Sequence, residues 1–297
     1  NEADIIVSLD ADTIINNNYL EAIHTIFLEY PTASGLSIPY LHPLTSDEQH
    51  NRALLRYEIY MRHYALNLYH HHIPYSFTAL GAAIALPVWS AKRINGISPK
   101  PNAEDFYLLQ QLFKTGQIIQ WCNTTVYPSA RLSHRVGLGT GPAIHKSLLG
   151  NNTSYPFYPQ HLFKEVAYTF QLFDELYYND IETPMTDFLK KQLKSNNLWD
   201  KLRKNFKDKN KFIHACTEKI DALRILQYLK TQHQQTEESD IINLQAFLDT
   251  FYPGHPFSNI SFSMSSMDQL ERLRTFLMQC EEPFRKATLT RLANGNP

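Results

Sequence analysis

The chain has 297 residues, of which 43% are hydrophobic and 19% are charged, values typical of a globular protein with one large or two ordinary domains. Its 28 Lys and Arg residues balance its 29 Asp and Glu residues, so the net charge of −1 gives no indication of a nucleic acid or an anionic membrane as partner. The longest apolar run, residues 79–89, is too short to cross a bilayer, and the three widely spaced cysteines fit neither a disulfide framework nor a zinc site.

Residues 4–128 alternate between short β-branched segments and longer amphipathic segments. This alternation predicts an α/β layer structure. The expected strands are residues 4–9, 35–39, 79–86 and 118–127, and the expected helices are residues 17–30, 47–69, 90–94 and 103–115.

The next segment, residues 129–160, is polar and rich in Gly, Pro and Tyr. Gly137, Gly139 and Gly141 lie within five residues, which predicts a loop and not the interior of a helix or a sheet.

The rest of the chain is predicted to be mostly helical, because apolar residues recur there every three or four positions. The expected helices are residues 162–178, 184–195, 211–233, 241–250 and 267–280. We therefore expect an α/β domain over residues 1–150 and a helical C-terminal region over residues 151–297.

The first chemical motif is DIIVSLDADT, residues 4–13. Its apolar start predicts a buried strand, and Asp10 and Asp12 follow at or just beyond the carboxyl end, where open α/β sheets bind ligands. Two close carboxylates repel each other, and Mg²⁺-type ions bind one or two carboxylates together with water and phosphate oxygens. The structural alternative is that Asp12 caps the helix expected from Asn17 onward.

A second acidic pair, Glu104 and Asp105, opens the helix expected at residues 103–115. Acidic residues at a helix start often serve only as partners of the helix dipole. Together with the first pair they allow a division of labour, in which one pair holds a metal and the other supplies a general base.

A third group consists of Arg131, His134 and Arg135, just before the glycine-rich segment. Two arginines, a histidine and exposed backbone N–H groups suit a diphosphate, which Arg131 or Arg135 would help to hold. An ordinary surface loop accounts for the same residues.

Three segments together resemble a family 2 glycosyltransferase with the GT-A fold. They are DIIVSLDADT, then GAAIALPVW followed by RINGI, then AEDFYLLQQLFKTGQII, and the resemblance covers residues 1–145. It implies a mixed, Rossmann-like sheet with flanking helices. It also implies metal-dependent, inverting transfer of a sugar from a UDP- or GDP-sugar to a hydroxyl of a glycan or lipid-linked acceptor, with Mn²⁺ or Mg²⁺ as the cation.

Carried over residue by residue, the resemblance puts Asp10 near the nucleotide ribose or the metal and makes Asp12 the metal ligand. Asp105 becomes the base, with Glu104 beside it, and His134 falls where some GT-A enzymes have a further metal ligand. An enzyme of glycan biosynthesis with these features is expected in the cytoplasm, with the inner face of the membrane as one option.

The family has strands and helices before its DxD motif, whereas this sequence starts at Asn1, close to that motif. We therefore expect that an N-terminal part has been removed. The strand at residues 4–9 should then have an unpaired edge or an uncovered apolar face, and the 297-residue chain should bind nucleotide sugars weakly.

Two further interpretations stay open. Residues 4–13 also resemble the first motif of haloacid-dehalogenase-like phosphatases, with Asp10 as nucleophile and Asp12 as acid–base. That family needs a later lysine and a second acidic pair of G-D-x-x-x-D type, and the chain contains no Gly-Asp dipeptide. The third interpretation is a binding module without catalytic activity, in which the helical C-terminal region docks a partner.

Overall fold

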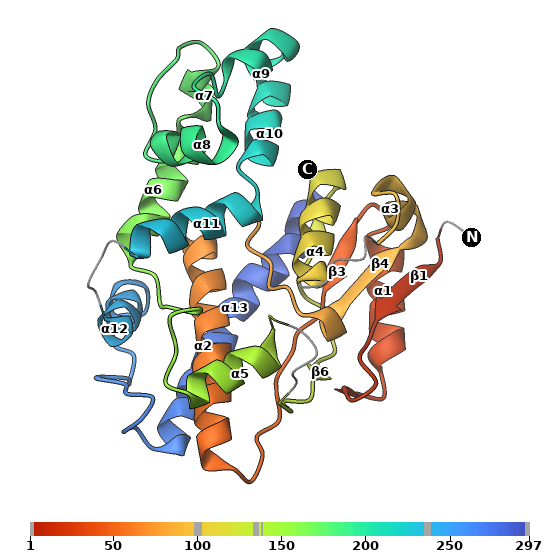
Figure 1. The fold of residues 1–297 in the computed structure, drawn as a ribbon. Helices are drawn as coiled ribbons and strands as arrows, with labels where there is room; N and C mark the ends of the chain where they lie inside the picture. The colour runs from red at the N-terminus through yellow and green to blue at the C-terminus, as the bar shows by residue number, and fades with distance from the viewer. Residues whose placement is uncertain (1–2, 98–102, 133–136, 138, 235–238, 295–297) are drawn as a thin grey trace. The chain divides into compact units, whose positions relative to one another are not determined.

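The structure, a computed structural model, describes residues 3–97, 103–132, 137, 139–234 and 239–294. It is a mixed α/β protein, with a small mixed sheet of four strands, flanking helices and a mostly helical C-terminal region (Figure 1). The chain forms two compact units, the first comprising Asn1–Ala65, Phe77–Pro156 and Ile260–Pro297, and the second Leu66–Ser76 and Phe157–Asn259. The domain boundary expected at residue 150 stays a prediction.

The first unit holds every strand of the described chain. Its elements are β1 (Ile5–Ser8), β2 (Ile14–Ile15), α1 (Tyr19–Glu29), β3 (Gly35–Ser37), most of α2 (Glu48–His70), the 3₁₀ turn η1 (Gly81–Ala83), β4 (Ile84–Pro87), α3 (Val88–Arg93), α4 (Glu104–Thr115), β5 (Ile118–Ile119), β6 (Val126–Tyr127), α5 (Thr140–Leu148) and α13 (Met267–Ala293).

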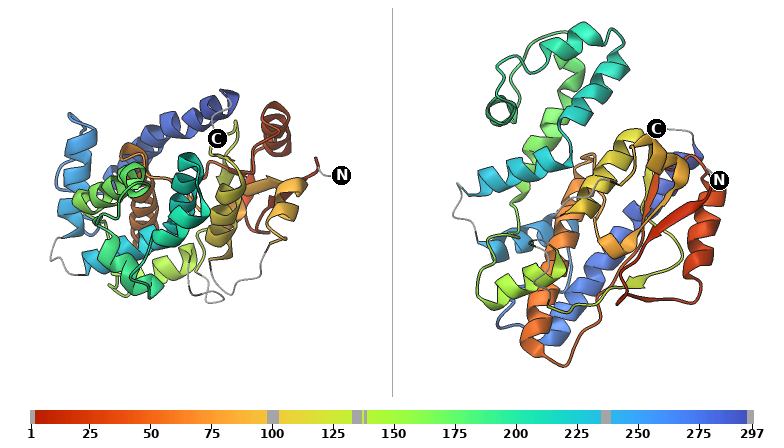
Figure 2. Two further views of the ribbon diagram at one scale, coloured as in Figure 1. Left: turned by 90° about the horizontal axis from the view of Figure 1, so that it is seen from above. Right: turned by 45° about the vertical axis from the view of Figure 1, so that its right-hand side comes forward.

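The main sheet has the strand order β1-β4-β3-β5, in which only β3 and β5 run parallel. Its central strands are apolar and fully buried, with Leu36 and Leu86 at 0% exposure. Seen from above, α1 and α13 lie on one side of the sheet and α4 on the other (Figure 2). Helix α4 packs closely against β3. A Cβ atom added at Gly35 would lie only 3.1 Å from the Cδ1 atom of Leu112, so the glycine permits this close packing.

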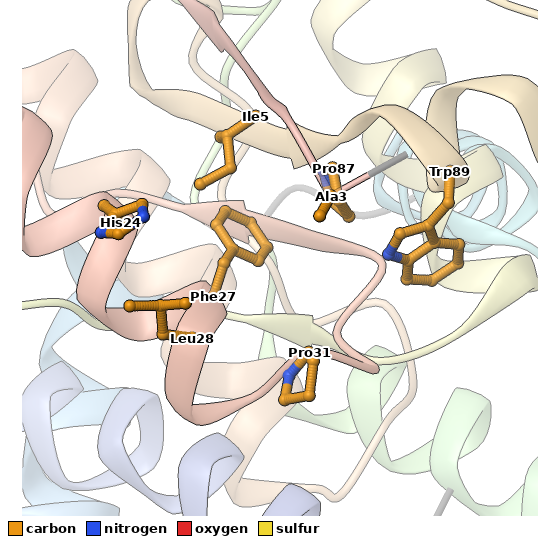
Figure 3. A pocket seen from close by; sticks show the side chains of 8 residues that line it. All are labelled: Ala3, Ile5, His24, Phe27, Leu28, Pro31, Pro87 and Trp89. Atoms are coloured by element: carbon orange, nitrogen blue, oxygen red, sulfur yellow. The ribbon is translucent and has the colours of Figure 1, made fainter. Parts of the chain in front are cut away.

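Strand β1 is at an edge of this sheet among the described residues, as expected from the sequence. The Val88 N–H donates to the Asp4 carbonyl, so by the two-residue alternation of a strand Ile6 also bonds to β4, whereas the backbone groups of Ile5 and Val7 point to the open edge. Beside this edge lies an apolar groove of about 380 Å³ (Figure 3). It is lined by Ala3, Ile5, His24, Phe27, Leu28, Pro31, Pro87 and Trp89.

A second, two-stranded ribbon joins β2 to β6, with Ile14 opposite Tyr127 and Ile15 opposite Val126. The segment after β3 holds this ribbon, because Val126 donates to the Pro39 carbonyl and accepts from the Leu41 N–H. The ribbon therefore ties the chain after β1 to the chain that leads toward Arg131.

The second unit contains helices and connecting turns, with no strand over its described residues. Its helices are α6 (Gln160–Gln171), α7 (Phe173–Leu176), α8 (Thr186–Leu193), α9 (Asp200–Asn205), α10 (Lys209–Lys219), α11 (Ala222–His233) and α12 (Asp240–Phe251). Large aromatic side chains at 0–2% exposure form its core, among them Phe163, Trp199, Phe212 and Phe247.

Several expected elements have different bounds in the structure. The strand expected over residues 118–127 is split into β5 and β6. The helix expected over residues 211–233 breaks at Ile220, and Asp221 then caps α11 by accepting from the Arg224 N–H. Helix α9 and strand β2 were not expected.

The largest correction concerns the segment expected to be a loop, because residues 140–148 form α5 with Gly141 in its first turn. Four residues of α5 are buried, Gly141, Pro142, Ala143 and Ile144, and Ile144 joins a core cluster with Leu54 and Ala130. Tertiary packing of this short apolar face therefore overrides the local preference of the glycines for a loop.

Candidate functional site

Asp10 and Asp12 lie in the turn that directly follows β1. The strand ends at Ser8, and the Thr13 N–H closes the turn by donating to the Asp10 carbonyl over 3.0 Å. Asp10 is exposed and Asp12 is half-exposed. Helix α1 begins only at Tyr19, and its N-cap residue makes no side-chain capping bond. Asp12 is therefore not a helix cap, so helix capping does not account for this acidic pair.

Arg131 makes an ion pair with Asp12, with 2.7 Å between the Nε and Oδ2 atoms. The β2–β6 ribbon brings them together, since the chain before Ile14 runs beside the chain after Tyr127. The side chain of Asp12 is 33% exposed and that of Arg131 is 60% exposed, so the pair faces solvent. Exposed pairs of this kind contribute only about 0–1 kcal/mol to stability. Two candidate residues far apart in the chain thus share one surface.

Asp105 lies in the first turn of α4, where the sequence predicts it. Its carboxylate accepts hydrogen bonds from the backbone N–H groups of Phe106, at 2.8 Å, and of Gly81. Burial raises the pKa of Asp105 above its usual value of 3.8, and the negative charge of Glu104 raises it further, while the two N–H donors oppose the shift. A carboxylate with a raised pKa, fixed by two donors, has the properties of a general base.

The turn η1 lies beside Asp105 and also contacts strand β1. On one side a Cβ at Gly81 would lie 4.0 Å from the Asp105 Oδ2 atom. On the other side η1 contacts β1, whose last residue Ser8 is paired with Ile84, the residue directly after η1. The Asp105 carboxylate and the end of β1, after which Asp10 and Asp12 follow in the chain, therefore both lie beside η1.

Two residues near Asp105 were not expected from the sequence. Ala103, directly before α4, has a left-handed backbone with φ of 58°, which costs a non-glycine residue about 1–2 kcal/mol. Tyr57 on α2 is buried, and its pKa is raised by that burial and, to a smaller degree, by neighbours that include Asp105. The helical spacing of Tyr57, Tyr60 and Tyr64 was the available signal for an aromatic face at this place.

The donor set at this turn fits a hard divalent cation. Over the described part of the chain, no group of three or more His, Cys, Asp or Glu side chains is arranged to hold a metal. Asp10 and Asp12 match the kind of Mg²⁺ or Mn²⁺ site that takes one or two carboxylates and completes its shell with water and phosphate oxygens. The Thr13 Oγ1 atom, buried and without a hydrogen-bond partner among the described residues, is a further oxygen at this turn.

His134 and Arg135, which the sequence predicts as a metal ligand and a diphosphate ligand, lie outside the described residues. Their roles stay predictions. The structure thus brings Asp12 and Arg131 into contact and holds Asp105 against η1.

Comparisons with known proteins add no relative to these observations. No protein-family model matches the chain, and neither a curated protein nor a solved structure matches it. Among the helices that the structure describes, none combines the length and the hydrophobicity that a membrane-spanning segment needs.

Proposed function

We propose that the chain belongs to a metal-dependent, inverting glycosyltransferase with a family 2, GT-A-type catalytic domain. The donor is a UDP- or GDP-sugar, and the acceptor is a hydroxyl of a glycan or a lipid-linked molecule. The observation that carries the proposal is the placement of two acidic groups: Asp10 and Asp12, with Arg131 paired to Asp12, directly follow β1, and the half-buried Asp105 lies against η1, which contacts β1.

At the donor end, Asp12 and Asp10 would hold the divalent cation, and Arg131 would contact the diphosphate. The cation, when bound, neutralises the negative charge that develops on the leaving nucleoside diphosphate. Arg131 suits the same task because its guanidinium group is always charged and can bind two phosphate oxygens at once. Its side chain is 60% exposed, so it is accessible to a ligand from solvent.

At the acceptor end, Asp105 would take the proton from the attacking hydroxyl, while the oxygen forms a bond to the anomeric carbon and the bond to the diphosphate breaks. Its raised pKa brings its proton affinity closer to that required of a base near neutral pH. The Gly81 and Phe106 N–H groups fix the orientation of the carboxylate. Glu104 is exposed beside it and acts through its charge.

The test is release of nucleoside diphosphate from UDP- and GDP-sugars by the 297-residue chain with Mn²⁺ or Mg²⁺, together with calorimetric binding of each donor. Asp105→Asn should lower turnover by about 10²-fold or more while donor affinity stays unchanged. Asp12→Asn should remove metal-dependent donor binding. Asp187→Asn, an exposed residue of α8 in the second unit, is the matched control.

Because weak donor binding is expected, each donor is titrated to its highest soluble concentration, and the proposal fails if no sugar nucleotide binds even then, or if Asp105→Asn leaves turnover unchanged. Loss of donor affinity in Asp105→Asn, with normal turnover of bound donor, makes Asp105 a binding residue and not the base. Hydrolysis of a simple phosphate ester, abolished by Asp10→Asn, would instead favour the phosphatase interpretation. Absence of both activities would favour a binding module.

A further inference from the structure

The ion pair between Asp12 and Arg131 occupies one of the carboxylate oxygens that a cation would use. The Arg131 Nε atom lies 2.7 Å from the Asp12 Oδ2 atom, a direct charge-assisted hydrogen bond. Pairing of β2 with β6 brings the chain before Ile14 beside the chain after Tyr127, which puts Arg131 within reach of Asp12.

A divalent cation on Asp12 cannot share this arrangement without cost. Bidentate binding would need the oxygen that accepts from Arg131, and binding through either oxygen would place two positive charges next to the guanidinium group. Arg131 can leave this pair at low cost, because its side chain is 60% exposed and, among the residues that the structure describes, the pair with Asp12 is its one side-chain ion pair. A diphosphate beside the cation would offer the departing arginine new oxygen acceptors.

We propose that Arg131 is the counter-ion of Asp12 in the metal-free protein and transfers to the diphosphate when cation and diphosphate bind together. The cation alone is opposed by the charge of Arg131 beside Asp12 and therefore binds weakly. When cation and diphosphate bind together, Arg131 exchanges its ion pair with Asp12 for an ion pair with the diphosphate, so the two ligands bind cooperatively. The inference rests on the proposed function for the identity of the ligand, a nucleoside diphosphate, but the competition at Asp12 does not depend on it.

The test compares wild type with Arg131→Gln in two binding measurements, made by calorimetry and by Mn²⁺ electron paramagnetic resonance. With Mn²⁺ alone, Arg131→Gln should bind the ion at least about fivefold more tightly, since the competitor is gone. With inorganic pyrophosphate at saturating Mn²⁺, the same variant should bind about tenfold more weakly, since the phosphate ligand is gone. These two effects have opposite signs, which general destabilisation cannot produce.

Two variants control the experiment. Arg272→Gln removes the same charge from an exposed position on α13, where the arginine lies 3.8 Å from Asp268, and should change neither affinity. Arg131→Lys keeps the charge and should keep Mn²⁺ binding weak. The proposal is overturned if wild type and Arg131→Gln bind Mn²⁺ alone equally, if neither binds it, or if Arg131→Gln leaves pyrophosphate binding unchanged.

Binding measurements with different ligands distinguish this inference from the proposed function. Opposite effects on Mn²⁺ and pyrophosphate, without any binding of UDP, GDP or their sugars even at their highest soluble concentrations, would support the Arg131 exchange and refute the glycosyltransferase. Binding of a nucleotide sugar with no effect of Arg131→Gln on Mn²⁺ alone would support the glycosyltransferase and refute the exchange.

Discussion

Arg62 on α2 and Glu281 on α13 form an ion pair in the interior of the first unit, where each side chain is only 1% exposed. Arg62 also pairs with Glu58 at 2.7 Å, and Arg274 of α13 lies 3.2 Å from the other oxygen of Glu58. The last helix is therefore joined to α2 by a buried network of alternating charge. It belongs to the sheet-bearing unit although nearly the whole chain separates it from β1.

The network predicts a large difference between two neighbouring glutamates of α13. Glu281→Gln leaves Arg62 with reduced charge compensation in the interior and should lower the free energy of unfolding by about 3 kcal/mol. Glu282→Gln removes a half-exposed partner of Lys286 and should cost less than about 1 kcal/mol. Urea denaturation of both variants measures the difference. Similar losses would show that the buried pair contributes no more to the free energy of unfolding than the exposed pair does.

Glu58 predicts a loss of stability in acid. Burial alone would raise its pKa, but Arg62, a hydrogen bond from His42 and Arg274 outweigh burial and lower the pKa to about 2 from the usual 4.5. Between these values the unfolded chain binds a proton that the folded protein does not, so the contribution of Glu58 is complete above pH 4.5 and is lost as the pH falls toward 2.

The measurement is the difference in unfolding free energy between wild type and Glu58→Gln as a function of pH. This difference should be large near neutral pH and should shrink as the pH falls below 4.5. Glu48→Gln, which removes a 64% exposed partner of Arg52, should give a small difference at every pH. A difference for Glu58→Gln that does not change with pH contradicts the lowered pKa.

Asp105 and Glu104 predict the pH dependence of the proposed reaction. The base must be ionised, and burial and then the charge of Glu104 raise the pKa of Asp105, so the acidic limb of kcat/KM should lie above pH 3.8. Glu104→Gln removes one cause of that raised pKa and should move the acidic limb to lower pH. An unmoved limb, or a shift to higher pH, would mean that Asp105 is not the group that titrates.

The open edge of β1 predicts unequal effects of proline at adjacent residues. The Ile6 N–H points toward β4, whereas the Val7 N–H points to the edge. Proline removes the N–H and is tolerated on an edge strand when that N–H faces outward. Ile6→Pro should therefore destabilise the protein by at least about 1 kcal/mol more than Val7→Pro in urea denaturation. Equal effects would show that another strand pairs with β1 in solution.

Much of the secondary structure could be read from local sequence. Helices α1, α2 and α4 each begin within two residues of the expected position, and β1 lies within the expected strand. These elements have a strong apolar period or a β-branched run, and such patterns depend only on which face is buried. Asp10, Asp12 and Asp105 are found at the ends of these elements for the same reason, so their placement after β1 and at the start of α4 was predictable.

Other elements depended on contacts that local sequence does not encode. Helix α13 was expected to end at Cys280, but it continues through Pro283 to Ala293. Its second half is held by Arg285, which donates to the backbone carbonyls of Gln120 and Ser37. Those carbonyls come from strand and loop segments far away in the chain, and hydrogen bonds to them stabilise a helical stretch that Pro283 disfavours.

The sequence by itself determined that two acidic pairs follow a strand and open a helix, because each pair is set by residues within a few positions of it. Only the tertiary structure decided that Asp12 would meet Arg131 and that Asp105 would be held by Gly81. The first contact needs β2 to pair with β6, and the second needs η1 to lie between β1 and α4. Both depend on pairing between distant segments, whose free energy comes from the whole packed unit and not from any local pattern.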